Sequence, residues 1–412
     1  MALTACIILM IVGMLIGTWI LSGIVPSMIY YGLLILSPKI FLFAACTICA
    51  LVALATGSSW STAGTIGVAL IGVGQGLGIP LPLVAGAIIS GSYFGDKMSP
   101  LSDTTNLAPS VAGSELFSHI RHMVWTTGPS MLIALLLYIG IGFFYGGDEM
   151  AAGNIEVLLD GIAAQFTVHW LLLLPPVLVA IVVGRRLPAI PALFGGAVLG
   201  GIIAIVVQGA AMADVMESAH VGYGVESGIA AVDSLLNRGG LDEMLPTIAL
   251  IICALAFGGV LEKTGMLTIL AEALLRMARS TGSLIATTIG TAVGINILVP
   301  DQYLSIIVPG RMYREAFQHA GLDPKNLSRC LEDGGTLTSP LVPWNTCGAF
   351  MWATLGVFPL AYLPFAFLNL INPFISLLYG MTGWTIVKLD PAGEGSEEVE
   401  IRSTSTEKPA VE

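Results

Sequence analysis

The sequence predicts an all-α polytopic membrane protein whose helices are broken or re-entrant at a few polar positions. The chain has 412 residues, of which 55% are hydrophobic and only 10% are charged. This composition leaves too few polar side chains to cover a water-facing surface. Prolines and polar residues interrupt some of the apolar runs, and landmarks of the first half recur in the second half.

The membrane spans are expected where apolar runs approach or reach the roughly 20 residues needed to cross a bilayer, and we expect about ten of them. The clearest runs are residues 4–20, 40–55, 131–144, 170–183, 192–207, 247–260, 284–299 and 358–378. Lysine and arginine in short loops mark the cytoplasmic side. Arg121, Arg185 and Lys263 then lie inside, and segments 114–122 and 267–279 are expected to lie along the inner interface.

Charge and motifs exclude several classes of protein. Part of the formal charge of −11 lies in an acidic C-terminal tail, which we expect to be disordered. No basic stripe indicates a nucleic acid partner. Cys46 and Cys49 lack the further ligands of a zinc site, and neither an HExxH nor a GxSxG pattern occurs in the sequence. We therefore expect no enzyme activity and no cofactor.

An internal repeat organises the chain. Residues 17–23 (GTWILSG) resemble residues 259–265 (GVLEKTG), and the tripeptide SPL occurs at Ser99 and again at Ser339. Many secondary transporters build a site at the bilayer midplane from two such copies, often inverted. We therefore expect two inverted repeats, 1–146 and 168–385, an external loop at 147–167 and a disordered acidic tail at 386–412. The runs 170–183 and 192–207 have no partner in the first copy, so the first repeat is expected to be N-terminally incomplete.

The most informative interruption is ISGSYFGDKMSPLSDTTNLAPSVAG at residues 89–113. Pro100 breaks helical hydrogen bonding there. Irregular backbone inside a bilayer survives only where protein buries it or a watery cavity adjoins it. Its oxygen atoms suit an alkali cation. Asp103 is the first candidate for binding an ion or a proton, Asp96 is the second, and the alternative is that one of them pairs with Lys97 outside the membrane. The further candidates are Ser99, Ser102, Thr104, Thr105 and Asn106.

A matching interruption, LEDGGTLTSPLVPWNTCG, occupies residues 331–348. Its candidates are Asp333, Thr336, Thr338, Ser339, Asn345 and Thr346. If the two broken segments face each other, we expect sodium to be held by Asp103, Ser102, Asn106, Thr338 and Asn345. Alternatively, Asp333 and Glu332 sit at the cytoplasmic end with Arg329 and Lys325.

Each half has a second polar interruption ahead of the main one, TGSSWS at 56–61 and GINILVPDQ at 294–302. Ser58 and Ser59 are either ion ligands or hydroxyls bonded back to helix carbonyls. Asp301 is either an ion ligand or a helix cap that follows Pro300.

At these residues the sequence resembles the NhaC family of sodium/proton antiporters. The matching stretches are ATGSSWSTAGTIGVAL at 55–70, GSYFGDKMSPLSDTTNLAP at 91–109, NRGGLDEM at 237–244, FGGVLEKTG at 257–265 and GTLTSPLVPWNTCGA at 335–349. The resemblance covers nearly all of residues 7–378. It implies two inverted repeats of the ion transporter superfamily type and exchange of external protons for internal sodium. Family members usually have about two more helices before this segment, which agrees with the asymmetry of the repeat.

The resulting hypothesis is a secondary active sodium/proton antiporter of the bacterial cytoplasmic (inner) membrane. A carboxylate would bind Na⁺ or H⁺ competitively while access alternates between the two sides. Its partners are the sodium ion, the proton and the lipid bilayer, with no nucleic acid and with homodimer formation left open. Some relatives exchange organic acids, so a Na⁺- and H⁺-coupled exchanger of the malate/lactate type is the alternative.

Overall fold

The computed structural model describes residues 2–145, 150–185 and 187–389, and nearly all of these residues that form regular structure are helical. Within them, six helices are long and apolar enough to cross a membrane, and two bent helix pairs raise the number to as many as eight. The prediction of an all-helical chain with several spans is therefore confirmed. The number is below the expected ten. The apolar run at 358–378, for example, is divided into three short helices.

The first half is a row of helices folded around the interruption at 99–102. Its elements are α1 (Ala2–Leu21), α2 (Ile24–Ile35), α3 (Pro38–Thr56), α4 (Ser59–Thr62), the π-helix η1 (Ala63–Gly67), α5 (Val68–Gly76), α6 (Leu81–Met98), α7 (Asp103–Ala112) and α8 (Leu116–Tyr145). Helices α3 and α6 approach closely because α6 has glycine at the contact. A Cβ on Gly91 would lie 2.1 Å from the carbonyl oxygen of Cys46, and one on Gly95 would lie 2.3 Å from the backbone nitrogen of Leu54. This packing fixes the rotation of α6 about its axis.

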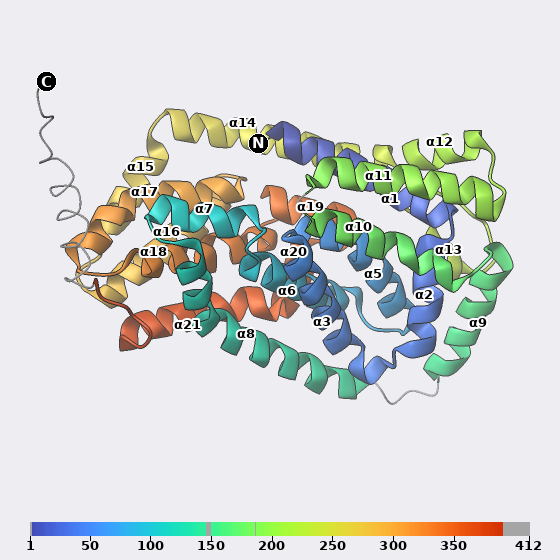
Figure 1. Cartoon of the computed structure of the whole chain (residues 1–412), viewed down its shortest axis with the longest axis horizontal. Coiled ribbons are helices and arrows are strands. Elements are labelled where there is room, and N and C mark those ends of the chain that lie inside the picture. The colour runs from blue at the N-terminus through green and yellow to red at the C-terminus, as the bar shows by residue number, and fades with distance from the viewer. Residues whose placement is uncertain (1, 146–149, 186, 390–412) are drawn as a thin grey trace, which may run out of the picture.

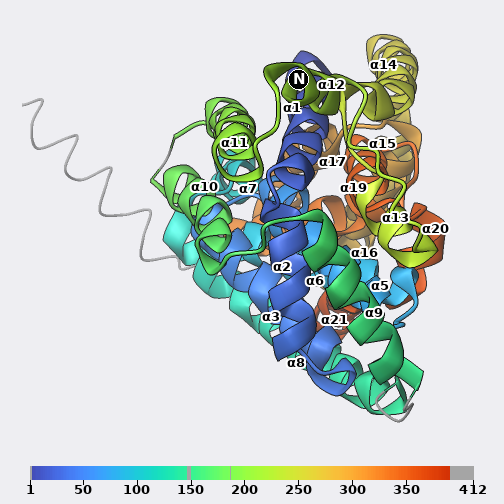
Figure 2. The same cartoon turned by 90° about the vertical axis from the view of Figure 1, so that its right-hand side faces the viewer.

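The middle of the chain contains α9 (Met150–Gln165), the 3₁₀ helix η2 (Trp170–Leu173), α10 (Leu174–Gly184), α11 (Ala189–Ile203), η3 (Ala204–Gln208), α12 (Met212–His220) and α13 (Ala230–Leu236). Helix α9 falls inside the expected loop 147–167 and forms a bent pair with the helix at Trp170–Gly184, at an angle of 98°. Residues 147–149 of that expected loop lie outside the described residues. In Figure 2, α10 and α11 form one flank of the molecule.

The second half contains α14 (Leu241–Lys263), α15 (Met266–Leu275), α16 (Thr281–Leu298), α17 (Gln302–His319), α18 (Pro324–Leu331), the π-helix η4 (Glu332–Thr336), η5 (Ser339–Leu341), α19 (Thr346–Leu355), α20 (Pro359–Tyr362), η6 (Leu363–Phe365) and α21 (Phe367–Thr382). Helices α8 and α21 pack side by side along one edge, and α1 packs between α11 and α14 along the opposite edge (Figure 1). The start of the predicted disordered tail is in contact with the protein, because Asp323 donates its backbone N–H to the carbonyl of Val387 at 3.0 Å. Residues 390–412 of that tail lie outside the described residues.

Helix ends recur in the same order in the two halves, and each is separated from its partner by the same number of residues to within one. A left-handed glycine follows α1 in the first half and α14 in the second. A polar N-cap residue begins α4 and its counterpart α17, and another begins α7 and its counterpart α19. A left-handed glycine then ends both α7 and α19. These pairs are Gly23 with Gly265, Ser58 with Asp301, Ser102 with Asn345, and Gly113 with Gly356. The repeat seen in the sequence therefore corresponds to a repeated order of helices and breaks.

The expectation of an interfacial segment at 114–122 is wrong. Helix α8 runs without interruption from Leu116, and His119 and His122 on its first turns are buried. The Nδ1 atom of His119 lies 2.7 Å from the hydroxyl of Ser328 on α18. Two polar residues of this segment, His119 and His122, are therefore buried within the protein, while Arg121 is exposed.

Candidate ion-binding site

The breaks of both halves meet inside the bundle. The break after α3 touches the break after α6, since a Cβ on Gly57 would lie 2.7 Å from the carbonyl carbon of Leu101. In the second half, Thr346 donates its backbone N–H to the carbonyl of Pro300 at 3.1 Å, which joins the breaks before α17 and α19. The hydroxyl of Tyr303 on α17 donates to the carboxylate of Asp103 on α7 and so connects the two halves.

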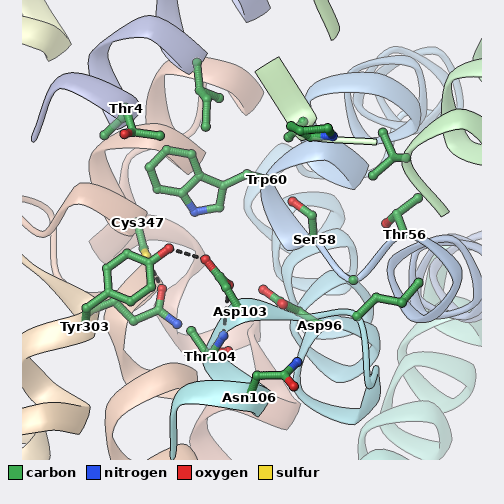
Figure 3. Close-up of a pocket in the computed structure, with 18 of the residues that line it drawn as sticks. Thr4, Thr56, Ser58, Trp60, Asp96, Asp103, Thr104, Asn106, Tyr303 and Cys347 are labelled. Atoms are coloured by element: carbon green, nitrogen blue, oxygen red, sulfur yellow. Dashed lines mark hydrogen bonds between the residues drawn. The ribbon is translucent and has the colours of Figure 1, made fainter. Parts of the chain in front are cut away.

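A cavity of about 980 Å³ lies where these breaks meet (Figure 3). Its volume is at the upper end of the roughly 300–1,000 Å³ found for small-molecule pockets. Three carboxylates line it, those of Asp96, Asp103 and Asp301, and no lysine, arginine or histidine is among its described lining residues. The other polar lining residues are Thr4, Thr56, Ser58, Trp60, Thr104, Asn106, Gln302, Tyr303, Thr346 and Cys347. A cavity with acidic walls and no basic side chain attracts cations.

The two carboxylates at the first main break are held differently. Asp96, in the last turn of α6, is 6% exposed and accepts three hydrogen bonds, from the Ser59 hydroxyl at 2.6 Å, the Ser59 backbone N–H at 3.2 Å and the Ser102 hydroxyl at 2.6 Å. Asp103, the first residue of α7, is exposed to the cavity and accepts from the backbone N–H of Thr104 at 2.9 Å and from Tyr303. Asp103 therefore has the freer carboxylate for a ligand that enters the cavity.

Several predicted ligands bond to the broken backbone. The Thr105 hydroxyl donates to the carbonyls of Asp96 at 3.1 Å and Lys97 at 2.9 Å, and these are final carbonyls of α6. The Ser99 hydroxyl donates to the carbonyl of Leu54 at 2.8 Å. The Asn106 amide donates to the carbonyls of Pro100 at 2.9 Å and Ser102 at 2.6 Å. These bonds satisfy groups that the unwound segment leaves without helical partners.

The earlier interruptions also contribute to the cavity. Ser58 lines it and caps α4 by accepting from the backbone N–H of Ser61 at 3.1 Å. The hydroxyl of Ser59 bonds to Asp96, so for this residue the alternative of a bond back to a helix carbonyl is wrong. Asp301 caps α17 by accepting from the backbone N–H of Tyr303 at 2.8 Å, and its side chain also lines the cavity. The alternative of a helix cap is therefore confirmed, and the role of Asp301 as an ion ligand stays a prediction.

Most candidates of the second main break lie away from the cavity. The Asn296 amide donates to the Thr338 hydroxyl at 3.0 Å, and the Asn345 amide donates to Asn296 Oδ1 at 3.1 Å. Ser339 donates to the carbonyl of Thr336 at 2.8 Å, and of the second-break candidates only Thr346 lines the cavity. The expected sodium shell is thus divided. Asp103 and Asn106 line the cavity, Ser102 is buried behind it against Asp96, and Thr338 and Asn345 lie in a separate polar cluster.

Lys97 forms a buried ion pair that we did not predict. Its ammonium donates to the carboxylate of Asp333 on η4, and both side chains are 0% exposed. Thr126 donates to the same carboxylate oxygen at 3.2 Å, and Arg329 Nε lies 3.9 Å from the other one. The alternative that Asp96 or Asp103 pairs with Lys97 is therefore wrong. Glu332, also 0% exposed, does not lie at a water-facing helix end.

Three residues important to the site were missed at the sequence level. Tyr303 bonds to Asp103, Asn296 holds two predicted ligands, and Trp60 lines the cavity while stacking on Phe350 with ring centroids 4.2 Å apart. Trp60 and Tyr303 each lie in the first turn after a predicted break, and this position was the available signal. Asn296 lies in the polar interruption at 294–302, but we did not assign it a role in the site.

Broken helices around an acidic cavity, inside a bundle of apolar helices, define a multi-pass membrane protein of the secondary-transporter class. Residues 91–384 match the Na⁺/H⁺ antiporter family, and the chain belongs to that family. This result confirms the resemblance, the antiporter class and the placement in a bacterial membrane.

Curated relatives cover most of the chain. The chain is 44% identical over 377 residues to the Na⁺/H⁺ antiporter NhaC of Alkalihalophilus pseudofirmus, a match that covers 91% of this chain and 81% of that relative. It is 42% identical over 381 residues to the malate-2H⁺/Na⁺-lactate antiporter of Bacillus subtilis, with 92% and 81% covered. It is 40% identical over 403 residues to the arginine/ornithine antiporter ArcD of Halobacterium salinarum, with 97% and 82% covered.

Proposed function

We propose that the protein exchanges sodium ions for protons across the cytoplasmic membrane and that Asp103, together with Asp96, carries the ion. The observation that supports this most directly is the position of both carboxylates at one helix break, on the wall of a cavity whose described lining contains no basic side chain. An ionisable residue inside a membrane span costs about 2.5–3.5 kcal/mol on insertion scales, and such residues usually serve ion or proton pathways. Sodium and protons are the substrates, and no cofactor takes part.

Competition for the carboxylates provides the exchange. Deprotonated Asp103 binds Na⁺ with oxygen atoms of neighbouring cavity residues such as Thr104 and Thr346, and protonation of the carboxyl releases the ion. Exchange follows if the loaded site faces one side of the membrane at a time. The hydrogen bond from Tyr303 to Asp103 links the two halves, which we propose are inverted repeats that move relative to each other.

Sodium-driven pH change in proteoliposomes tests this proposal. We expect Asp103→Asn and Asp96→Asn each to lower the exchange rate at least tenfold, because an amide cannot exchange a proton for a cation. Asp323→Asn is the matched control, since Asp323 pairs with Lys325 in a partly exposed position. If Asp103→Asn exchanges at the control rate, Asp103 is not the carrier.

A second candidate, exchange of organic acids, is favoured by the size of the cavity and by the name of the B. subtilis relative. The described cavity lining offers no lysine or arginine to a carboxylate ligand, so binding would depend on helix N-termini at the breaks or on a co-bound sodium ion. Flux measured with sodium alone and with sodium plus malate or lactate separates the two functions. Full exchange without an organic acid rejects the second candidate.

A further inference from the structure

Glu332 is a buried acid that the sodium cavity does not include. It is the first residue of the π-helix η4, its side chain is 0% exposed, and neither carboxylate oxygen has a hydrogen-bond partner in the described parts of the chain. π-Helical turns occur often at functional sites. A buried polar group without a partner requires an explanation, and for a carboxyl the usual one is that it binds a proton.

The charges around Glu332 come from three elements. Lys97 and Asp96 lie on α6, Arg329 lies on α18, and Asp333 is the next residue of η4. Two cations therefore face three carboxyl groups. Asp333 contacts both cations, so one carboxyl among Glu332 and Asp96 is in excess of the positive charge.

The other elements packed on η4 do not change this balance. Helices α16 and α21 contain no aspartate, glutamate, lysine, arginine or histidine, and the charged side chains of α17 are exposed. The only charged side chain of α7 is Asp103, which faces the cavity. On α8, His119 and His122 lie near the two cations.

We propose that Glu332 is a proton-binding site separate from the sodium cavity, and that it releases its proton when a cation enters the cavity beside Asp96. With the cavity empty and Asp96 ionised, Lys97 and Arg329 balance Asp96 and Asp333, and Glu332 is neutral. A sodium ion at Asp96 adds one positive charge, and the ionised form of Glu332 balances it. This coupling rests on the proposed function, because it requires that sodium binds at Asp96 and Asp103.

The register of α6 provides the physical connection. Consecutive residues of an α-helix point about 100° apart. Asp96 therefore faces the cavity while Lys97 lies on a different face of the helix and contacts Asp333. Charge enters on one face of α6, and the proton leaves from another face.

Infrared difference spectra of the purified full-length chain in nanodiscs test the proposal. Spectra with sodium are compared with spectra in choline at equal ionic strength, and binding of radioactive sodium is measured on the same samples. In the unmodified protein we expect sodium to remove a protonated-carboxyl band. The part of that loss that comes from Glu332 should be absent in Glu332→Gln, shifted in Glu332→Asp, and unchanged in Glu315→Gln, which alters an exposed acid of α17. The number of protons released per bound sodium should fall by about one in Glu332→Gln.

The outcomes are distinct. If Glu332→Gln binds sodium and loses the same carboxyl band as the unmodified protein, Glu332 is not the proton site and the proposal is overturned. If Glu332→Gln does not fold, the shift in Glu332→Asp decides in the same way. If the unmodified protein binds no sodium, the proposed function is refuted, and so is the coupling of Glu332 to sodium. A Glu332 band in pH-difference spectra would then still show that Glu332 binds a proton.

Discussion

The buried pair of Lys97 and Asp333 gives a prediction whose size follows from the geometry. Removing one partner of a buried ion pair leaves an uncompensated charge and costs about 3–5 kcal/mol. Asp333→Asn should fall at the upper end, about 5 kcal/mol. Among the described residues, Lys97 then retains as a hydrogen-bond partner only the Asn372 side-chain oxygen at 3.2 Å, and Arg329 loses the nearby carboxylate.

Removing the other partner, Lys97, should cost less folding free energy. In Lys97→Met, Arg329 Nε remains 3.9 Å from Asp333. Two unit charges at this distance attract by about 4 kcal/mol at an effective dielectric constant of about 20. We therefore expect a loss near the lower end of the range, about 3 kcal/mol.

The assay is reversible unfolding of the purified protein in mixed micelles, followed by circular dichroism. Asp323→Asn is the control, because Asp323 and Lys325 form a pair at 3.3 Å whose side chains are 29% and 21% exposed. Such a pair is worth less than about 1 kcal/mol. If Asp333→Asn is no more harmful than Asp323→Asn, or if Lys97→Met costs more than Asp333→Asn, the reasoning about this pair is refuted.

Two further predictions concern packing and pH. Gly91→Ala should cost about 1–3 kcal/mol in the same assay, because its Cβ would lie 2.1 Å from the carbonyl oxygen of Cys46. Gly290→Ala is the control and should cost nothing, since a Cβ there would have nothing within 4 Å. Equal effects of the two substitutions would contradict the close contact at Gly91. At the start of α8, backbone N–H groups of Phe117 and Ser118 donate to Glu115 and hold its pKa below the usual range. Because the folded pKa is the lower one, this contribution is complete above the unfolded pKa and is lost as pH falls through the folded pKa. Glu115→Gln should therefore be less stable than the unmodified protein at neutral pH and should converge with it in acid, and a gap that is constant with pH would contradict the assignment.

Local chemistry made the breaks predictable. Pro100 removes a helix donor, and Ser102 then begins α7 as its N-cap. Asp301 begins α17 directly after Pro300 in the same way. Each of these signals lies within a few residues of its effect, so the sequence was sufficient to place the acidic residues at the ends of broken helices.

Partners distant in sequence were not predictable from one chain. Lys97 and Asp333 are 236 positions apart in the sequence, and nothing in the sequence indicates that the two side chains meet. Which face of α6 packs on η4 depends on the glycine contact between α6 and α3. The spacing of Gly91 and Gly95 permits a close approach, but it does not identify α3 as the partner. The same limit explains why Thr338 and Asn345 were assigned to the sodium shell, since their partner Asn296 lies on a third helix.

The different directions of Asp96 and Lys97 restrict how this protein can change in length. Helix α6 cannot rotate to correct an error, because Gly91 and Gly95 hold it against α3. Deleting Asp96 would turn the amine of Lys97 toward the cation cavity, and inserting one residue between Gly95 and Asp96 would turn it about 100° away from Asp333. Either change would leave Asp333 without its ammonium partner. We expect working versions of this transporter to accept length variation in surface connections, and to accept none in these few residues.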